Sequence, residues 1–193
     1  MPIKAHHHTI VALVENKPGV LNRIASKWRQ RGFNIESLAV GHSEVPGLSR
    51  MTFVVDGATT DVEQVTKQLY KVIEVVKIAD ISDEDMVARE LALIKVAASP
   101  TSRSAIIEIT DIFRADIVGV SPDTLIVQVT GREDKIDAIV EMLKAYGIRE
   151  LVRTGRVAVT RGGGASAAVE GGDGAPRRYR SAGEGKSKVG SLL

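Results

Sequence analysis

The stretch Glu15-Asn16-Lys17-Pro18-Gly19-Val20-Leu21 decides the fold of the first half of the chain, because it separates two hydrophobic patterns. Residues 10–14 before it are an apolar run that alternates between two faces of a strand, whereas residues 20–28 after it carry apolar side chains at helical spacing. Proline suits the first turn of a helix, where its missing N–H would have no helical partner. The stretch therefore predicts a turn from a strand into a helix.

This predicted helix start has the chemistry of a small anion site. Gly19 permits close approach of a ligand or a second backbone. The first turn of a helix has unpaired N–H groups and lies at the positive end of the helix dipole, which suits a carboxylate. The alternative interpretation is a plain strand-to-helix turn that binds nothing.

The first half of the chain follows the order β-α-β-β-α-β. A strand is expected over residues 8–16 and a helix from Pro18 to a stop at Gly32. Two strands, over residues 33–41 and 49–56, flank a turn at Val45-Pro46-Gly47. A capping box from Thr60 to Glu63 opens the second helix, and residues 75–81 form the last strand.

The second half of the chain repeats the same order. The predicted elements are a strand over residues 90–97, a helix after Ser99, a hairpin of residues 117–120 and 125–130, a helix over 133–146, and a strand over 148–160 interrupted at Gly155. Two such units indicate an α+β protein with two tandem ferredoxin-like βαββαβ domains. One sheet with helices on a single face leaves strand edges and a second face open, so at least a dimer is expected.

Composition shifts define the expected domain organisation. A first domain is expected over residues 1–82, an acidic linker over 83–88, a second domain over 89–160, and a disordered Gly/Ala/Arg-rich tail over 161–193. The tail has a net charge of +3 against +2 for the whole chain, which leaves about −1 for the rest. The two domains therefore show no bias toward a polyanionic partner.

Several function classes lack their sequence signals. The chain has no cysteine, which excludes disulfides, thiolate metal sites and a thiol nucleophile. It has no long apolar segment, so neither a membrane span nor a signal peptide is expected. We therefore expect a cytoplasmic location. Neither G-x-S-x-G nor H-E-x-x-H occurs, and the end of a P-loop at Gly185-Lys186-Ser187 lacks its first glycine and its strand.

One cluster of histidines and one cluster of arginines could be binding sites, but both have simpler interpretations. His6-His7-His8 could ligate a metal, but adjacent residues of a strand point to opposite sides, so surface histidines are the simpler interpretation. Arg177-Arg178-Tyr179-Arg180 could touch nucleic acid only weakly, because few charges and one aromatic are available. We therefore expect no metal on this chain and no nucleic-acid partner.

Two motifs carry a family resemblance: E-N-x-P-G-V-L over residues 15–21 and R-G-F-N-I-E-S-L over residues 31–38. Together they resemble the small, regulatory subunit of acetolactate synthase, also called acetohydroxyacid synthase. Residues 48–52, 67–69 and 89–91 are similar to that family too, and the resemblance runs over residues 8–160. It implies that the first domain is an ACT domain and the second a C-terminal ACT-like regulatory domain.

The resemblance implies an effector site shared by two chains. In an ACT homodimer, valine or another branched-chain amino acid binds where the first-helix loop of one chain faces the start of the second strand of the other. Carried over, the effector-binding residues are Asn16, Pro18, Gly19, Val20 and Leu21 of one chain and Asn34 and Ile35 of its partner. These residue types suit an amino acid, because helix N–H groups bind a carboxylate, an asparagine oxygen accepts a hydrogen bond from an ammonium group, and aliphatic side chains line an apolar pocket.

The implied function is regulation of a separate catalytic subunit in the biosynthesis of valine, leucine and isoleucine. The small subunit would activate the large, thiamine-diphosphate- and magnesium-dependent subunit, which condenses pyruvate with pyruvate or 2-oxobutyrate, and would transmit feedback inhibition. No catalytic residue and no cofactor are expected on this chain. The preferred amino acid stays open, since one methylene changes affinity by only about 1–3 kcal/mol. The alternatives are a free-standing ACT-type module serving another enzyme or a transcription regulator, and an enzyme in its own right.

Overall fold

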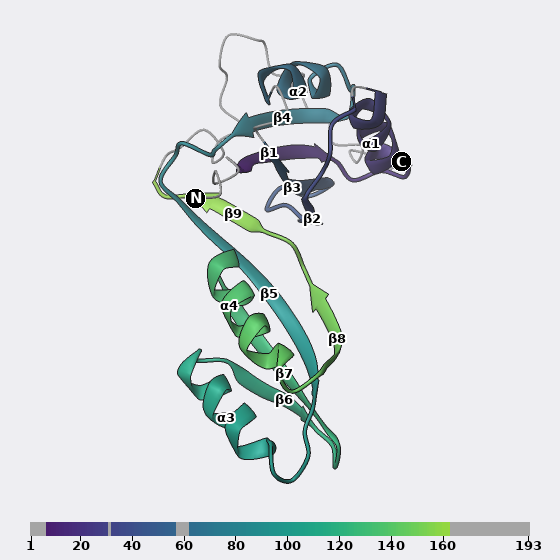
Figure 1. Cartoon of the computed structure of the whole chain (residues 1–193). Coiled ribbons are helices and arrows are strands. Elements are labelled where there is room, and N and C mark those ends of the chain that lie inside the picture. Colours follow the sequence, from purple (N-terminus) through teal and green to yellow (C-terminus); the bar gives the residue numbers. More distant parts are fainter. Residues whose placement is uncertain (1–6, 31, 57–61, 163–193) are drawn as a thin grey trace, which may run out of the picture.

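The chain forms two βαββαβ units connected in sequence, as the computed structural model shows for residues 7–30, 32–56 and 62–162 (Figure 1). This architecture confirms the predicted α+β class with two tandem ferredoxin-like folds. Two expectations lie outside the described residues: the disordered tail, apart from Arg161 and Gly162, and the capping residue Thr60.

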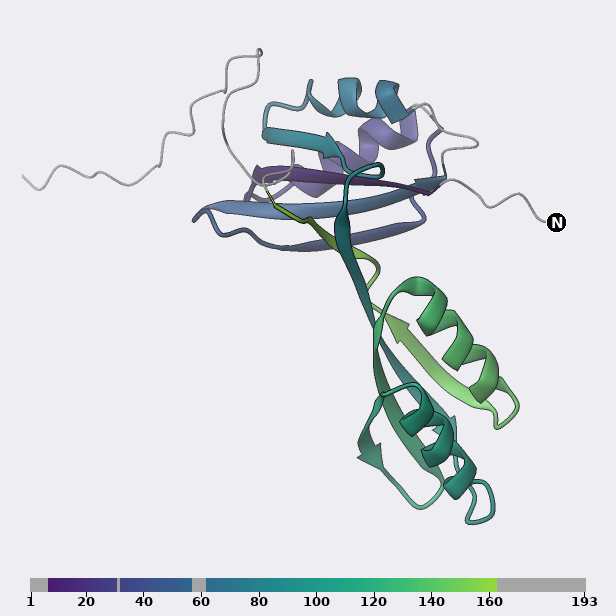
Figure 2. The same cartoon turned by 90° about the vertical axis from the view of Figure 1, so that its left-hand side faces the viewer.

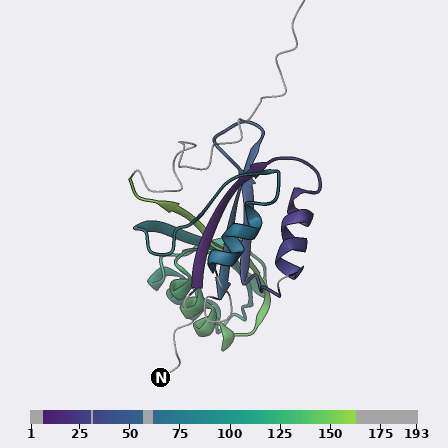
Figure 3. The ribbon, with the colours of Figure 1, turned by 90° about the horizontal axis from the view of Figure 1, so that it is seen from above.

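The first unit, residues 7–80, is a four-stranded antiparallel sheet with two helices on one face. Its elements are β1 (His7–Glu15), α1 (Val20–Gln30), β2 (Ser37–His42), β3 (Leu48–Asp56), α2 (Val62–Leu69) and β4 (Val75–Asp80). The strand order is β2-β3-β1-β4, so β2 and β4 are the edges. Viewed from above, α1 and α2 lie side by side over the sheet (Figure 3).

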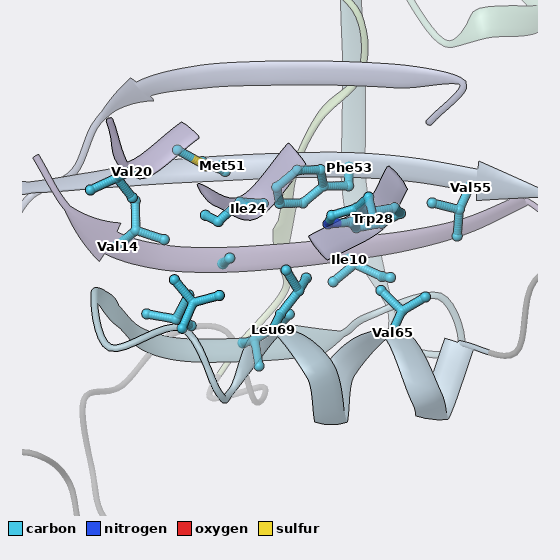
Figure 4. Packing of buried hydrophobic residues seen from close by; sticks show 14 residues of the cluster. Ile10, Val14, Val20, Ile24, Trp28, Met51, Phe53, Val55, Val65 and Leu69 are labelled. Atoms are coloured by element: carbon cyan, nitrogen blue, oxygen red, sulfur yellow. The ribbon is translucent and has the colours of Figure 1, made fainter. Parts of the chain in front are cut away.

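The core of the first unit lies between this sheet and its helices. Trp28 of α1 stacks on Phe53 of β3 with ring centroids 5.1 Å apart, and Phe33 meets the edge of Trp28 at 6.3 Å. Figure 4 shows the rings of Trp28 and Phe53 among aliphatic side chains from β1, β3 and both helices. Burial of each large side chain contributes about 1.5–3 kcal/mol, so this layer fixes α1 on the sheet.

The strand β2 begins at Ser37, later than the predicted residue 33. Gly32 adopts a φ of +68° and ends α1, and the N–H of Phe33 then donates to the carbonyl oxygen of Trp28 at 3.2 Å. Phe33 and Ile35 pack against the core, whereas Asn34 between them is exposed. Residues 33–36 are therefore a connection whose apolar side chains are held by the core, and strand pairing starts only after it.

The second unit, residues 86–160, repeats the topology. Its elements are β5 (Met86–Ala97), α3 (Arg103–Ile112), β6 (Asp116–Val120), β7 (Thr124–Gly131), α4 (Glu133–Lys144), β8 (Ile148–Arg153) and β9 (Val157–Thr160). The strand order is β6-β7-β5-β8, and β9 pairs with the first residues of β5. The longest helix in the described part of the chain is α4, with 12 residues, and no helix there is long and apolar enough to cross a membrane.

A ribbon of β5 and β9 joins the two units. Because Met86 pairs with Thr160 and Arg89 with Val157, β5 begins at Met86 and not at the predicted Glu90, so part of the expected linker 83–88 is strand. The predicted interruption at Gly155 is present, with β8 ending before it and β9 starting after it.

The ribbon lies against the face of the first sheet that carries no helices (Figure 2). Val11 of β1, Ile81 and Ala158 of β9 form a small buried cluster there, with Met86 and Ala88 packed against it. The second face of the first sheet was expected to be uncovered. The ribbon instead covers part of it, which fixes the second unit to the first.

Candidate functional site

The predicted helix start is present at Gly19. Its φ of +84° is a conformation that side-chain-bearing residues rarely adopt, and its carbonyl oxygen accepts the N–H of Arg23 at 3.0 Å. A Cβ at this position would have no heavy atom of this chain within 4 Å. Within one chain glycine is therefore needed for the backbone turn, and the space beside it is open.

Backbone donors are exposed at this turn. The N–H groups of Gly19, Leu21 and Asn22 have no hydrogen-bond partner among the described residues, and that of Val20 makes only a long contact of 3.4 Å with Lys17 oxygen. The first turn of α1 contains no acidic side chain that could occupy these donors. Unpaired N–H groups at the positive end of a helix dipole favour an anion.

Three of the proposed site residues present side chains at this end of α1. Asn16 and Pro18 are exposed, and Leu21 is 44% exposed. The N–H of Asn16 donates to Gly47 oxygen at 2.8 Å, which holds its backbone while leaving the side chain accessible. Val20 differs, because its side chain is buried in the core at 3% exposure and only its backbone faces the turn.

The other proposed residues, Asn34 and Ile35, lie after the opposite end of α1. Asn34 is exposed, and its side chain has no hydrogen-bond partner in the described part of the chain. Ile35 is half-buried against the core. The 11 residues of α1 span about 16 Å at 1.5 Å per residue. One chain therefore does not bring the two sets of residues together around a single amino acid.

A second group of polar residues, at the junction of the two units, was not predicted from the sequence. The N–H of Arg156 donates to Ser37 Oγ at 3.0 Å, its Nη1 donates to Thr9 Oγ1 at 3.0 Å, and its Nη2 donates to Glu133 Oε2 at 2.5 Å. The only available signal was an arginine on each side of Gly155 in an interrupted strand. Arg156 thus contacts β1, the start of β2 and the start of α4.

Two other arginines, Arg153 and Arg50, lie near this junction. Arg153 pairs with both oxygens of Glu90, at 2.8 and 2.7 Å, and with Asp137 at 2.8 Å. These bonds, first of all those to the Glu90 carboxylate, hold the pKa of Arg153 well above its usual range. Arg50 donates to Ala158 oxygen at 3.1 Å, and burial of Arg50 lowers its pKa.

A charged hollow of about 860 Å³ lies beside Arg156. It is lined by charged residues of both units, including His7, Arg89, Glu133 and Arg161. His7, which lines this hollow, has its Nε2 3.9 Å from Glu36 Oε2, and its chain neighbour His8 has its Nδ1 2.8 Å from Asp80 Oδ2. His6 is outside the described residues, within which no three His, Asp or Glu side chains are grouped as metal ligands.

Comparison with known families and proteins identifies relatives along both units. The profile for the small subunit of acetolactate synthase matches residues 89–162, and that for the AHAS small subunit-like ACT domain matches residues 10–77. The probable acetolactate synthase small subunit of Archaeoglobus fulgidus is 57% identical over 155 residues, which cover 80% of this chain and 97% of the relative. The acetolactate synthase small subunit of Bacillus subtilis is 52% identical over 154 residues, covering 79% of this chain and 90% of that protein.

A solved structure agrees with these relationships. The crystal structure of the acetolactate synthase small subunit from Thermotoga maritima matches with a TM-score of 0.75 and 40% identity. The match covers 80% of this chain and 97% of that chain.

Proposed function

Because the chain belongs to the family of acetolactate synthase small subunits, we propose that it regulates a separate catalytic subunit of acetolactate synthase in branched-chain amino-acid biosynthesis. In this role it activates the catalytic subunit and transmits feedback inhibition by valine. The condensation of pyruvate with pyruvate or 2-oxobutyrate, with its thiamine diphosphate and magnesium, belongs to that partner. The chain acts in the cytoplasm and is not catalytic alone.

The effector site of this proposal is shared by two chains in a homodimer. The observation that carries it is the separation of the two sets of site residues by the length of α1, together with unpaired N–H groups at Gly19, Leu21 and Asn22. A second chain supplies what one chain lacks: its Asn34 and Ile35 come to lie against the first chain's Asn16, Pro18 and helix start.

The chemistry of the two sets suits a free branched-chain amino acid. The bare amides at the start of α1 bind its carboxylate, and an asparagine oxygen of Asn16 or Asn34 accepts from its ammonium. Leu21 is exposed on one side and Ile35 lies on the other, so both can contact the aliphatic side chain. A ligand held by two chains favours the dimer over the monomer, which gives the differential affinity that a regulator needs.

The second unit supplies part of the contact with the catalytic subunit in this proposal. Its edge strand β6 exposes Val118 and Val120 to 53% and 70%. An open strand edge with exposed β-branched side chains is a typical protein interaction surface. This location separates partner binding from effector binding, which takes place in the first unit.

The experiment that tests the effector site is a charge substitution at Gly19. We expect Gly19→Asp to fold, since aspartate is a favourable residue before a helix and tolerates positive φ better than most residues. Its carboxylate repels the ligand's own, so valine affinity measured by calorimetry should fall at least about tenfold, or roughly 1.4 kcal/mol.

Gly19→Asn is the matched control, because asparagine imposes a similar backbone cost and size without the charge. Its valine affinity should stay well above that of Gly19→Asp. Equal affinity of wild type and Gly19→Asp for valine would overturn the site assignment.

A further inference from the structure

The start of β9 touches the start of β2 next to the proposed effector residues. Ser37, which accepts the N–H of Arg156 at 3.0 Å, follows Ile35 by two positions. We infer that this contact, with Arg156 as a positioning residue, couples occupancy of the effector site to the second unit. The inference rests on the proposed function, because it concerns regulation through the same site.

Arg156 spans a row of three strands on the face opposite the helices. Thr9 of β1 and Ser37 of β2 both pair with Val54 of β3, so the three residues are lateral neighbours. Arg156 bonds both ends of the row, through its N–H to Ser37 and through Nη1 to Thr9 at 3.0 Å. A displacement of β2 relative to β1 must therefore move Arg156 or break one of these bonds.

Gly155 makes this contact close. It has a φ of +78°, and a Cβ at this position would lie 2.5 Å from Ser37 Oγ and 3.5 Å from Leu38 oxygen. Side-chain-bearing residues essentially never make a contact of 2.5 Å, so a larger residue would force the Ser37 side chain or the Gly155 backbone to shift. The connection from β8 to β9 consequently lies directly on β2, and a small shift of β2 reaches it.

The side chain of Arg156 carries the contact into the second unit. Its Nη2 donates to Glu133 Oε2 at 2.5 Å, and Glu133 is the first residue of α4. The Arg156 side chain is 19% exposed and that of Glu133 is 43% exposed, and a hydrogen bond between two charged groups is stronger than one between neutral groups. One arginine thus links β1, β2 and α4 by hydrogen bonds and an ion pair, which are contacts of the kind that carry coupling between distant sites.

The test compares valine binding with valine inhibition in the complex with the catalytic subunit. For Arg156→Ala, we expect the dissociation constant for valine, measured by calorimetry on the small subunit, to change less than about twofold. Fractional inhibition of the complex at saturating valine should be largely lost, because a typical coupling between sites is modest and removal of its connection abolishes it. A merely structural loss would change binding and inhibition together.

The matched control is Arg161→Ala. Arg161 lines the same hollow and carries the same charge, but its N–H and side chain contact Asp85 and not the first sheet. Valine should inhibit the complex that contains Arg161→Ala as strongly as it inhibits the complex with the wild-type small subunit. Ser37→Ala provides a second, milder test, because it removes the acceptor of the Arg156 N–H and leaves the Glu133 ion pair in place; it should also reduce inhibition.

Each outcome separates the two proposals. Wild-type inhibition in both Arg156→Ala and Ser37→Ala, with valine bound, would overturn the coupling and leave the effector site standing. Failure of the wild-type chain to bind valine, leucine or isoleucine would overturn the effector site and the coupling together. If Arg161→Ala lost as much valine inhibition as Arg156→Ala, the coupling would also be contradicted, because the loss would then be a general effect of removing a positive charge.

Discussion

Arg153 pairs with two carboxylates of the second unit. It bonds both oxygens of Glu90, which is only 7% exposed, and also reaches Asp137. Because the pKa of Arg153 is raised in the folded state, its contribution to stability is fully present below the unfolded pKa and is lost only as the pH rises through the folded one. The contribution therefore persists across the neutral range.

We expect Arg153→Ala to lower the free energy of unfolding by about 3 kcal/mol. The substitution leaves the Glu90 carboxylate buried without its partner, which is more costly than the loss of an exposed pair. Urea unfolding at pH 7 measures the effect.

The control for this prediction is Arg132→Ala, since the Arg132 side chain is 75% exposed and lies 3.7 Å from Asp134. Its effect should stay within about 0.5 kcal/mol. The double variant Arg153→Ala, Glu90→Gln should recover part of the lost stability. A cost for Arg153→Ala no larger than that of Arg132→Ala would contradict the account of this ion pair.

The sequence predicted the conformation of Gly19 correctly but not the location of the Val20 side chain. The Pro18-Gly19 pair predicted a helix start, and the positive φ of Gly19 and the bare amides around it agree with that prediction. The side chain of Val20 was expected to line an apolar pocket, but in a single chain it is 3% exposed and packs in the core. Helical spacing correctly placed Val20 on the apolar face of α1, and that face packs in the core, so the side chain does not line a surface pocket.

Among the elements, β6 carries the expected contact with the catalytic subunit. We expect Val120→Lys to weaken binding to that subunit at least about tenfold, because a lysine on an open strand edge opposes pairing and burial. Valine binding by the small subunit should not change, since β6 belongs to the second unit. Pull-down titration and calorimetry measure the two affinities.

Met142→Lys serves as the control for β6. Met142 is 53% exposed on α4 of the same unit, so the change adds the same charge at a comparable apolar surface residue. Its affinity for the catalytic subunit should equal that of the wild type. If Val120→Lys bound as tightly as Met142→Lys, β6 would not be the contact.

Most elements were predictable because their signals are local. Alternation, helical spacing and turn residues gave every strand and helix of the two units in the right order. The predicted starts of β2 and β5 were wrong because long-range contacts decide them: Phe33 and Ile35 are held by the core, and β9 extends β5 backward to Met86. Short-range patterns contain neither signal.

The contacts between the two units could not be predicted either, because they too depend on residues far apart in the sequence. Ser37 and Arg156 are 119 positions apart in the sequence, and their bond exists only because the ribbon lies on the first sheet. Nothing in the pattern around Gly155 distinguishes a glycine that meets a hydroxyl of another unit from one that only interrupts a strand.

At the scale of the whole molecule, the proposed function makes the chain one half of a sensor. The start of α1 and the connection before β2 lie at the two ends of a helix about 16 Å long, so each chain offers two unlike half-sites. In the proposed homodimer, a symmetric pair of chains would bring each half-site against its complement and so create two equivalent sites. Assembly and effector binding are then linked by mass action.

Valine binding by mixed dimers shows whether two chains share one effector site. Gly19→Asp damages the half-site at the start of α1, and Asn34→Ala damages the half-site before β2, so each variant alone should bind valine poorly. When the two variants are mixed and allowed to exchange, each mixed dimer contains one site built from the two undamaged halves. Calorimetry should then detect wild-type affinity at a reduced number of sites, whereas no recovery in mixed dimers of verified composition would contradict a site shared between chains.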